Sequence, residues 1–169
     1  MSRIYVALDL ETTGLNSERD AIIEIGMVKF RDEQVLDRWS SLVNPCRPIP
    51  YRIQQLTGIT QEEVDAAPSF SSIMGAVLSF LKDYPIVGHS VPFDLGFLNR
   101  QGLFLSNQAI DTFELAGILL PHVARYSLEK LAEALNIRFP TRHRALEDAL
   151  ATKDLFLALV EQASKLDMT

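Results

Sequence analysis

The chain has 169 residues, of which 47% are hydrophobic and 22% charged, and this composition predicts one globular domain spanning residues 1–169. It excludes a disordered or collagen-like chain, and no apolar run approaches the roughly 18 residues of a membrane helix. The net charge of −6 argues against a broad basic face for duplex DNA but agrees with a local contact or a site that holds cations. One cysteine, Cys46, and a start without signal-peptide features predict a reducing, cytoplasmic location.

The first part of the chain predicts three strands followed by a loop. Residues 4–9 are mostly apolar and precede a glycine-containing turn, which is typical of a buried strand. Residues 22–30 and 35–43 predict two further strands and therefore a β meander. Three prolines within residues 44–50 fix φ and remove backbone donors, so this segment is expected to be a loop.

The rest of the chain predicts helices with short strands between them. Apolar residues recur at helical spacing from Phe70 to Leu81 and predict a helix over 69–82. Ser90 and Pro92 indicate the start of another helix, with a hydroxyl N-cap and a proline in the first turn, which would carry residues 93–103. Further helices are expected near 53–56, 61–66, 112–119, 127–135 and 144–164, and strands at 86–89 and 109–111. This order indicates a mixed α/β layered domain.

Asp9 and Glu11 form the one spaced carboxylate pair that falls on a predicted strand. Side chains two apart on a strand point to the same face, so both would project from its end, close enough to share a cation. Without a metal, one buried acid would have to take up a proton or lose several kcal/mol in desolvation. The alternative is that Glu11 already lies in a solvated turn.

Asp94 lies in the first turn of the helix predicted after Ser90. An acid there is stabilised by the helix dipole by about 0.3 to 1 kcal/mol, with no chemical role required. Its neighbours Phe93 and Leu95 are apolar, however, so this turn is expected to pack against the sheet and to enclose the acid in part.

His143 and Asp148 are five positions apart, a spacing that turns a helix by about 140°. They cannot share a helix face, so His143 should precede the helix that carries Asp148. A histidine near metal ligands suits a general base, and a solvent-exposed loop histidine is the alternative. The basic residues around it would hold a substrate phosphate or form a solvated loop. They are Arg138, Arg142 and Arg144.

The ordered motifs resemble those of DEDD-type 3′–5′ exonucleases of the histidine variant, the family of the proofreading epsilon subunit of bacterial DNA polymerase III. They are Asp9-Leu-Glu11-Thr-Thr-Gly-Leu15, His89-Ser-Val-Pro-Phe-Asp94 and His143-x4-Asp148, and the resemblance covers nearly the whole chain. Residues 22–26, 56–60 and 126–128 are further family-like strings. The resemblance implies an α/β, RNase H-like exonuclease fold with a mixed central sheet flanked by helices.

The resemblance also implies a catalytic set. Two divalent cations, Mg²⁺ or Mn²⁺, would be held by Asp9, Glu11, Asp94 and Asp148, and His143 would activate the attacking water. Hard carboxylate ligands suit these ions, and two ions about 3.5 to 4 Å apart stabilise both oxygens of a phosphodiester displacement. The expected reaction removes nucleoside 5′-monophosphates from 3′ ends of single-stranded or frayed DNA, in proofreading or repair.

The same resemblance implicates substrate-binding residues in the first two motifs. They are Thr12, Thr13, Leu15, His89, Ser90 and Phe93. Ser90 departs from the asparagine that family members commonly carry, which affects how the nucleotide beside the scissile bond is contacted. Glu24 is interpreted as a structural acid with a buried partner and is left outside the site.

Two alternatives stay open. A 3′–5′ exoribonuclease or oligoribonuclease would carry the same catalytic set, which says nothing about the 2′-hydroxyl. A non-catalytic module would use the fold to bind a nucleic-acid end or a polymerase, although no ligand position is lost here. Such domains also occur with, or fused to, polymerases and helicases.

Overall fold

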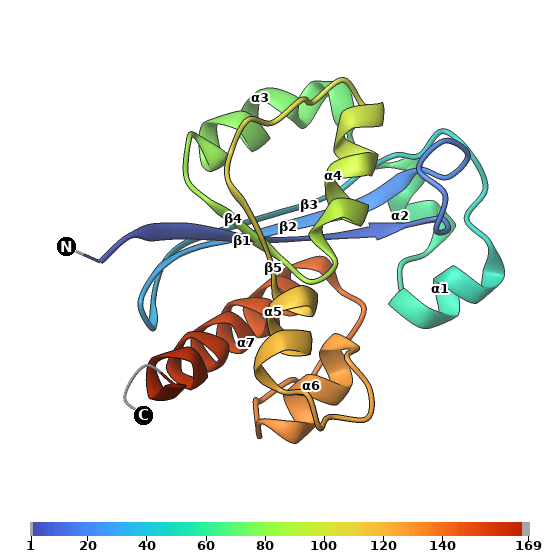
Figure 1. Cartoon of the computed structure of the whole chain (residues 1–169). Helices are drawn as coiled ribbons and strands as arrows, with labels where there is room; N and C mark the ends of the chain where they lie inside the picture. The colour runs from blue at the N-terminus through green and yellow to red at the C-terminus, as the bar shows by residue number, and fades with distance from the viewer. Residues whose placement is uncertain (1, 167–169) are drawn as a thin grey trace.

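The computed structural model describes residues 2–166, which form a five-stranded sheet covered by helices on both faces (Figure 1). The sheet has the order β3-β2-β1-β4-β5, in which β1, β2 and β3 are antiparallel and β4 and β5 run parallel to β1. The predicted meander and mixed sheet are therefore confirmed. The strands are β1 Ile4–Thr12, β2 Ile22–Arg31, β3 Gln34–Leu42, β4 Ile86–Gly88 and β5 Ala109–Asp111.

The helices form two layers and a small group at the end of the sheet where β1 finishes. Helices α3 and α4 cover one face, α5, α6 and α7 lie on the other, and α1 and α2 lie at that end (Figure 1). No helix within residues 2–166 is long and apolar enough to span a membrane. The helices are α1 Tyr51–Thr57, α2 Gln61–Asp65, α3 Phe70–Leu81, α4 Val91–Arg100, α5 Thr112–Leu119, α6 Leu128–Ala134 and α7 Ala145–Leu166.

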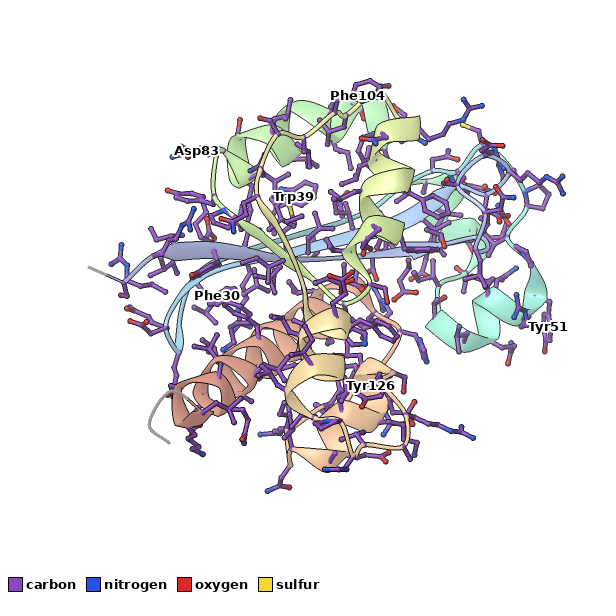
Figure 2. The ribbon with its side chains drawn as sticks, viewed as in Figure 1. Phe30, Trp39, Tyr51, Asp83, Phe104 and Tyr126 are labelled. Carbon is purple, nitrogen blue, oxygen red and sulfur yellow. The ribbon has the colours of Figure 1, made fainter. Side chains whose placement is uncertain are left out.

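Strand β1 divides the core between the two helical layers. Its residues Val6, Leu8 and Leu10 belong to the core beside α3 and α4, whereas Ala7 belongs to the core beside α7. Figure 2 shows Trp39 on the α3 side of the sheet and Phe30 on the α7 side. Because the side chains of a strand alternate, the odd-numbered acids at the end of β1 are directed to the α7 side.

β1 continues three residues beyond its predicted end at Asp9. Glu11 pairs with Glu24 of β2, and a register shift follows between Glu11 and Thr12. Glu11 therefore lies in a buried strand, and the alternative of a solvated turn is wrong.

Helix α4 starts and ends differently from its prediction. Ser90 is the N-cap residue and Pro92 lies in the first turn, as predicted, but Ser90 has a left-handed backbone, with φ 62°, and its hydroxyl forms no cap hydrogen bond, so that part of the prediction is wrong. The Ser90 N–H instead donates to Asp111 Oδ1 at 2.8 Å. The helix ends at Arg100 because Gly102 turns the chain with φ 84°, a conformation that glycine adopts readily.

Helix α7 begins in direct contact with the sheet at Gly26. A Cβ atom at position 26 would lie 2.4 Å from the backbone carbon of Ala145 and from the nitrogen of Leu146. Only glycine permits so close an approach, so β2 and the first turn of α7 are packed backbone against backbone.

Candidate metal centre

Three carboxylates meet where the end of β1 faces the first turn of α7. Asp9, Glu11 and Asp148 each offer one oxygen, and these atoms lie within 4.8 Å of one another. Glu11 is 9% and Asp148 8% exposed. The predicted shared face of Asp9 and Glu11 accounts for two of the three groups, and the docking of α7 brings in the third.

Asp94 reaches the same cleft from α4 on the other face of the sheet. Its side chain is 3% exposed, and Oδ1 accepts the Leu10 N–H at 3.2 Å. This bond ties the first turn of α4 to β1 between Asp9 and Glu11. The enclosure predicted from the apolar neighbours of Asp94 is therefore present.

Burial raises the pKa values of all four carboxyl groups. Desolvation is the largest cause in each case: it holds the pKa of Asp9 and of Asp94 well above the ordinary value and raises that of Glu11 to about 8 and that of Asp148 to about 7. Asp148 is the strongest neighbouring charge acting on both Asp9 and Glu11. At neutral pH the group can ionise fully only beside compensating positive charge.

One oxygen of the cluster has no partner. Asp9 Oδ2 is buried and accepts no hydrogen bond from any residue in the range 2–166. A buried carboxylate oxygen without a donor is costly unless a cation ligates it. The donor set consists of carboxylate oxygens alone, which Mg²⁺ and Mn²⁺ prefer, so these residues fit a divalent metal.

His143 lies two residues before the start of α7, so it precedes the helix as the sequence predicted. It has a left-handed backbone, with φ 58°, and its N–H donates to Asp148 Oδ1 at 3.0 Å. The imidazole lines the cleft and forms no hydrogen bond or ion pair within residues 2–166. Its ring nitrogens are thus available beside the carboxylates.

The four carboxyl groups and the His143 imidazole line a cleft of about 300 Å³. Of the predicted substrate residues, Thr12, Leu15, His89 and Phe93 line it, whereas Thr13 and Ser90 do not. The Thr13 hydroxyl accepts the Ala21 N–H at 2.9 Å and so closes the loop after β1. Thr13 and Ser90 therefore support the backbone around the cleft.

His89 is fixed in the cleft wall by both ring nitrogens. Nε2 lies 2.7 Å from the Tyr126 carbonyl oxygen, which can only accept, and Nδ1 lies 2.8 Å from the Thr112 hydroxyl. Burial lowers the pKa of His89. The lowered pKa favours the neutral ring, and Nε2 donates to the Tyr126 carbonyl oxygen.

Helix α1 forms one wall of the cleft. The acidic and histidine motifs of the sequence did not predict this wall. Arg52, Leu56 and Thr57 line the cleft, and Arg52 is the one lysine or arginine among the described lining residues. Leu56 is 48% and Leu15 83% exposed. The only sequence signal for this wall was the family-like string over residues 56–60.

Two of the three arginines around His143 are paired with different acids. Arg142 pairs with Glu129 and Glu133 of α6, whereas Arg144 pairs with Glu24 of β2. The buried partner expected for Glu24 is present, because Glu24 Oε1 accepts the N–H of the buried Ala145 at 2.7 Å; Arg144, its second partner, is 40% exposed.

Comparison with known proteins identifies the family. The RNase T exonuclease family profile matches residues 6–156. The chain belongs to this exonuclease family. It is 38% identical over 155 residues to the PolC-type DNA polymerase III of Clostridium perfringens and 40% identical over 170 residues to that of Thermotoga petrophila. These matches cover 89% and 98% of the chain but only 11% and 12% of the polymerases.

Solved exonuclease structures share the fold. Exonuclease X in complex with 5′ overhanging duplex DNA superposes with a TM-score of 0.80 at 27% identity, over 95% of this chain and 93% of that one. Escherichia coli exonuclease I with a dT13 oligonucleotide gives a TM-score of 0.82 at 18% identity, over 97% and 42% of the two chains. The RNase H-like exonuclease fold expected from the motifs is confirmed.

Proposed function

We propose that this exonuclease-family chain is a metal-dependent 3′–5′ exonuclease that hydrolyses the terminal phosphodiester bond of single-stranded or frayed DNA. The observation that carries the proposal is the buried carboxylate cluster, with its partnerless Asp9 Oδ2, beside the free imidazole of His143. The products are a nucleoside 5′-monophosphate and a strand shortened by one nucleotide.

Two divalent cations, Mg²⁺ or Mn²⁺, would be held by the four acids of the cleft. When bound, such ions stabilise the attacking and the leaving oxygen of the displacement. Asp9 and Glu11 approach from β1, Asp148 from α7 and Asp94 from α4, so the cluster is supported by both helical layers. Their raised pKa values make metal binding and proton release parts of one event.

His143 is proposed to be the general base. Its imidazole takes a proton from the attacking water, whose oxygen forms the new bond to phosphorus, while the bond from phosphorus to the 3′ oxygen breaks. The 3′ oxygen leaves on the shortened strand and takes up a proton, and the phosphate leaves on the released nucleotide. The Asp148 hydrogen bond to the His143 N–H holds the base beside the cluster during this step.

The walls of the cleft suit a single-stranded end. The exposed side chains Leu15 and Leu56, with Phe93, offer apolar contacts for bases, and Arg52 offers a charge for a backbone phosphate. Thr12 and His89 complete the proposed nucleotide pocket. The DNA in the exonuclease X complex and the polymerase relatives favour a DNA end, action beside a polymerase and a bacterial cytoplasmic location.

The test is degradation of end-labelled DNA and RNA oligomers with free or blocked 3′ ends, in Mg²⁺, Mn²⁺ or EDTA. We expect stepwise loss from free 3′ DNA ends, dependent on metal and abolished by Asp9→Ala. If RNA oligomers are degraded faster than DNA oligomers, the proposed activity becomes that of an exoribonuclease. Folded protein that cleaves neither polymer with either metal would contradict the catalytic proposal and favour an end-binding module.

A further inference from the structure

Glu24 is a buried acid next to the metal centre that does not belong to it. It pairs with Glu11 across β1 and β2 and is 5% exposed, yet it is not among the three acids whose oxygens converge. A buried carboxylate in this position requires partners of its own.

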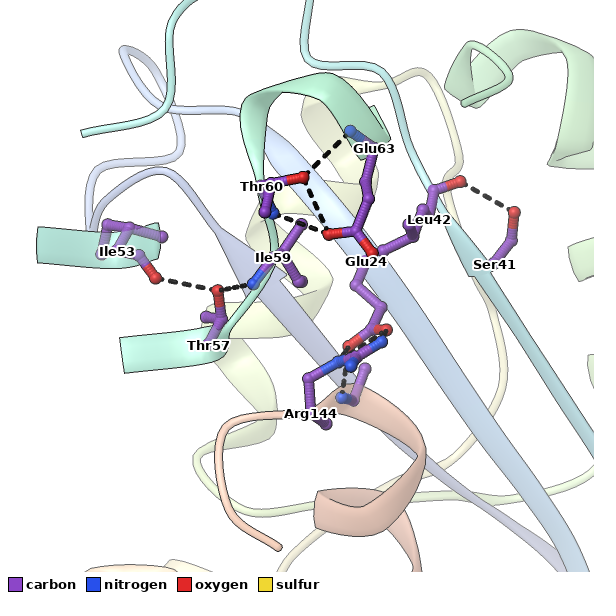
Figure 3. A network of polar contacts seen from close by, with 10 residues as sticks. Glu24, Ser41, Leu42, Ile53, Thr57, Ile59, Thr60, Glu63 and Arg144 are labelled. Atoms are coloured by element: carbon purple, nitrogen blue, oxygen red, sulfur yellow. Dashed lines mark hydrogen bonds and ion pairs between the residues drawn. The ribbon is translucent and has the colours of Figure 1, made fainter. Parts of the chain in front are cut away.

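Both oxygens of Glu24 are directed at the start of α7 (Figure 3). Oε1 accepts the Ala145 N–H at 2.7 Å and lies 3.2 Å from Arg144 Nε, while Oε2 accepts from Arg144 Nη2 at 2.8 Å. The carboxylate thus binds the side chain of one residue and the backbone of the next, and the two residues directly follow His143.

His143 has a backbone conformation that needs this support. Its φ of 58° is unfavourable for a residue with a side chain and persists only when neighbouring contacts fix it. On one side the His143 N–H is held by Asp148, and on the other the chain is held by Glu24. Asp148 itself lies further into α7, where the adjacent Ala149 is fully buried in the core.

We propose that Glu24 is a positioning residue: by holding Arg144 and Ala145 it fixes the left-handed turn at His143 and so sets the place of the imidazole in the cleft. The inference rests on the proposed function, which gives His143 the role of general base. It assigns Glu24 a role in turnover and not in ligation of the metal.

Glu24→Gln is the sharpest change, since it keeps the shape of the side chain. An amide has one acceptor oxygen, whereas Arg144 and the Ala145 N–H present donors only, so one of them loses its partner and faces the amide NH₂. We expect kcat to fall by about tenfold to a hundredfold, as for a small displacement of a reacting group, with KM changed less than about twofold. Arg144→Lys keeps a donor for Glu24 and should retain most of the activity.

The matched control is Glu129→Gln in α6, which removes one of the two ion pairs of Arg142 on the other side of His143. Its kcat should equal that of the wild type. If both glutamine variants lose the same fraction of activity, the effect is a general loss of order around this loop and the inference is overturned.

A double-mutant cycle with His143→Ala separates positioning from mere stability. If Glu24 acts through His143, Glu24→Gln lowers kcat in the wild type but not in the His143→Ala background. An equal loss of kcat in both backgrounds would overturn the inference. If the wild type is inactive or His143→Ala retains full activity, the proposed function fails instead.

Amide hydrogen exchange gives a measurement that does not depend on activity. The Ala145 N–H is buried and bound to Glu24, so its protection should fall in Glu24→Ala, which removes both acceptor oxygens, while that of core strand β1 stays unchanged. Unchanged protection at Ala145 would overturn the inference whatever the kinetics show.

Discussion

At the residue scale, we expect substitution of Asp9 to lower activity and to raise the stability of the metal-free protein. Asp9→Asn removes one of the proposed metal ligands. A loss of several kcal/mol of transition-state stabilisation corresponds to about a thousandfold loss of turnover. The same change removes a buried charge that repels Asp148 and Glu11 in the metal-free protein. We therefore expect the variant to be inactive and, at pH 8 in EDTA, to melt at a higher temperature than the wild type.

Calorimetry and the oligomer assay test the two halves of this prediction together. At pH 5, where the carboxyls of the cluster hold protons, the two melting temperatures should converge. A variant that keeps its activity would remove Asp9 from the ligand set.

Arg52 carries a second prediction at this scale. It is the one strong cation lining an otherwise acidic cleft, and it forms no ion pair within the described residues. Arg52→Ala should raise KM for an oligomer severalfold, leave kcat nearly unchanged and reduce the salt dependence of binding by about one phosphate contact. Arg47→Ala, outside this cleft, is the control; equal salt dependence in wild type and Arg52→Ala would exclude a phosphate contact.

At the element scale, the contact of β2 with α7 decides whether the cluster assembles. Gly26→Ala would place a methyl group 2.4 Å from the α7 backbone and force the helix away, at a cost of about 1 to 3 kcal/mol. The displacement should also weaken metal binding, because Asp148 moves with the helix. Urea unfolding and Mn²⁺ titration measure both effects.

Gly75→Ala is the matched control within a helix. Position 75 of α3 has nothing within 4 Å of an added Cβ, and its φ is not left-handed. Alanine there should stabilise the fold by about 0.5 to 1 kcal/mol and leave metal affinity as it is. If both alanine variants behave alike, close packing at Gly26 is not what positions α7.

The elements also show how far sequence patterns extend. Period-two alternation placed Asp9 and Glu11 on one face, and the five-residue spacing placed His143 before α7, because both follow from local geometry. The end of β1, the left-handed Ser90 and the α1 wall were missed, since each depends on partners distant in sequence: β2, Asp111 and the cleft itself. The hydrogen bond from the Leu10 N–H to Asp94 joins residues 84 positions apart, so no local sequence pattern predicts it.

At the scale of the whole molecule, the acidic cluster links stability to pH and metal. The folded-state pKa values of Glu11 and Asp148, about 8 and about 7, lie above the ordinary 4.5 and 3.8. Stability from these groups is therefore complete below about pH 4 and is lost as pH rises toward 8. In EDTA the melting temperature should fall over this interval on account of the cluster.

Divalent cations should reverse that trend. They bind the ionised cluster, so the difference between the melting temperatures with Mg²⁺ and with EDTA should grow from pH 5.5 to pH 8. Asp9→Asn should show a smaller difference at every pH. A difference that is independent of pH would mean that the metal binds elsewhere.

The distribution of the four acids along the chain has a consequence for biosynthesis. Within the described residues, Asp9 and Glu11 are synthesised before Asp94, and His143 and Asp148 come last, at the start of α7. Until that helix is made, β1 and β2 lack the cover that brings the last ligand and the base to the cluster. The three converging carboxylates and the His143 imidazole therefore come together only when α7 docks on the sheet.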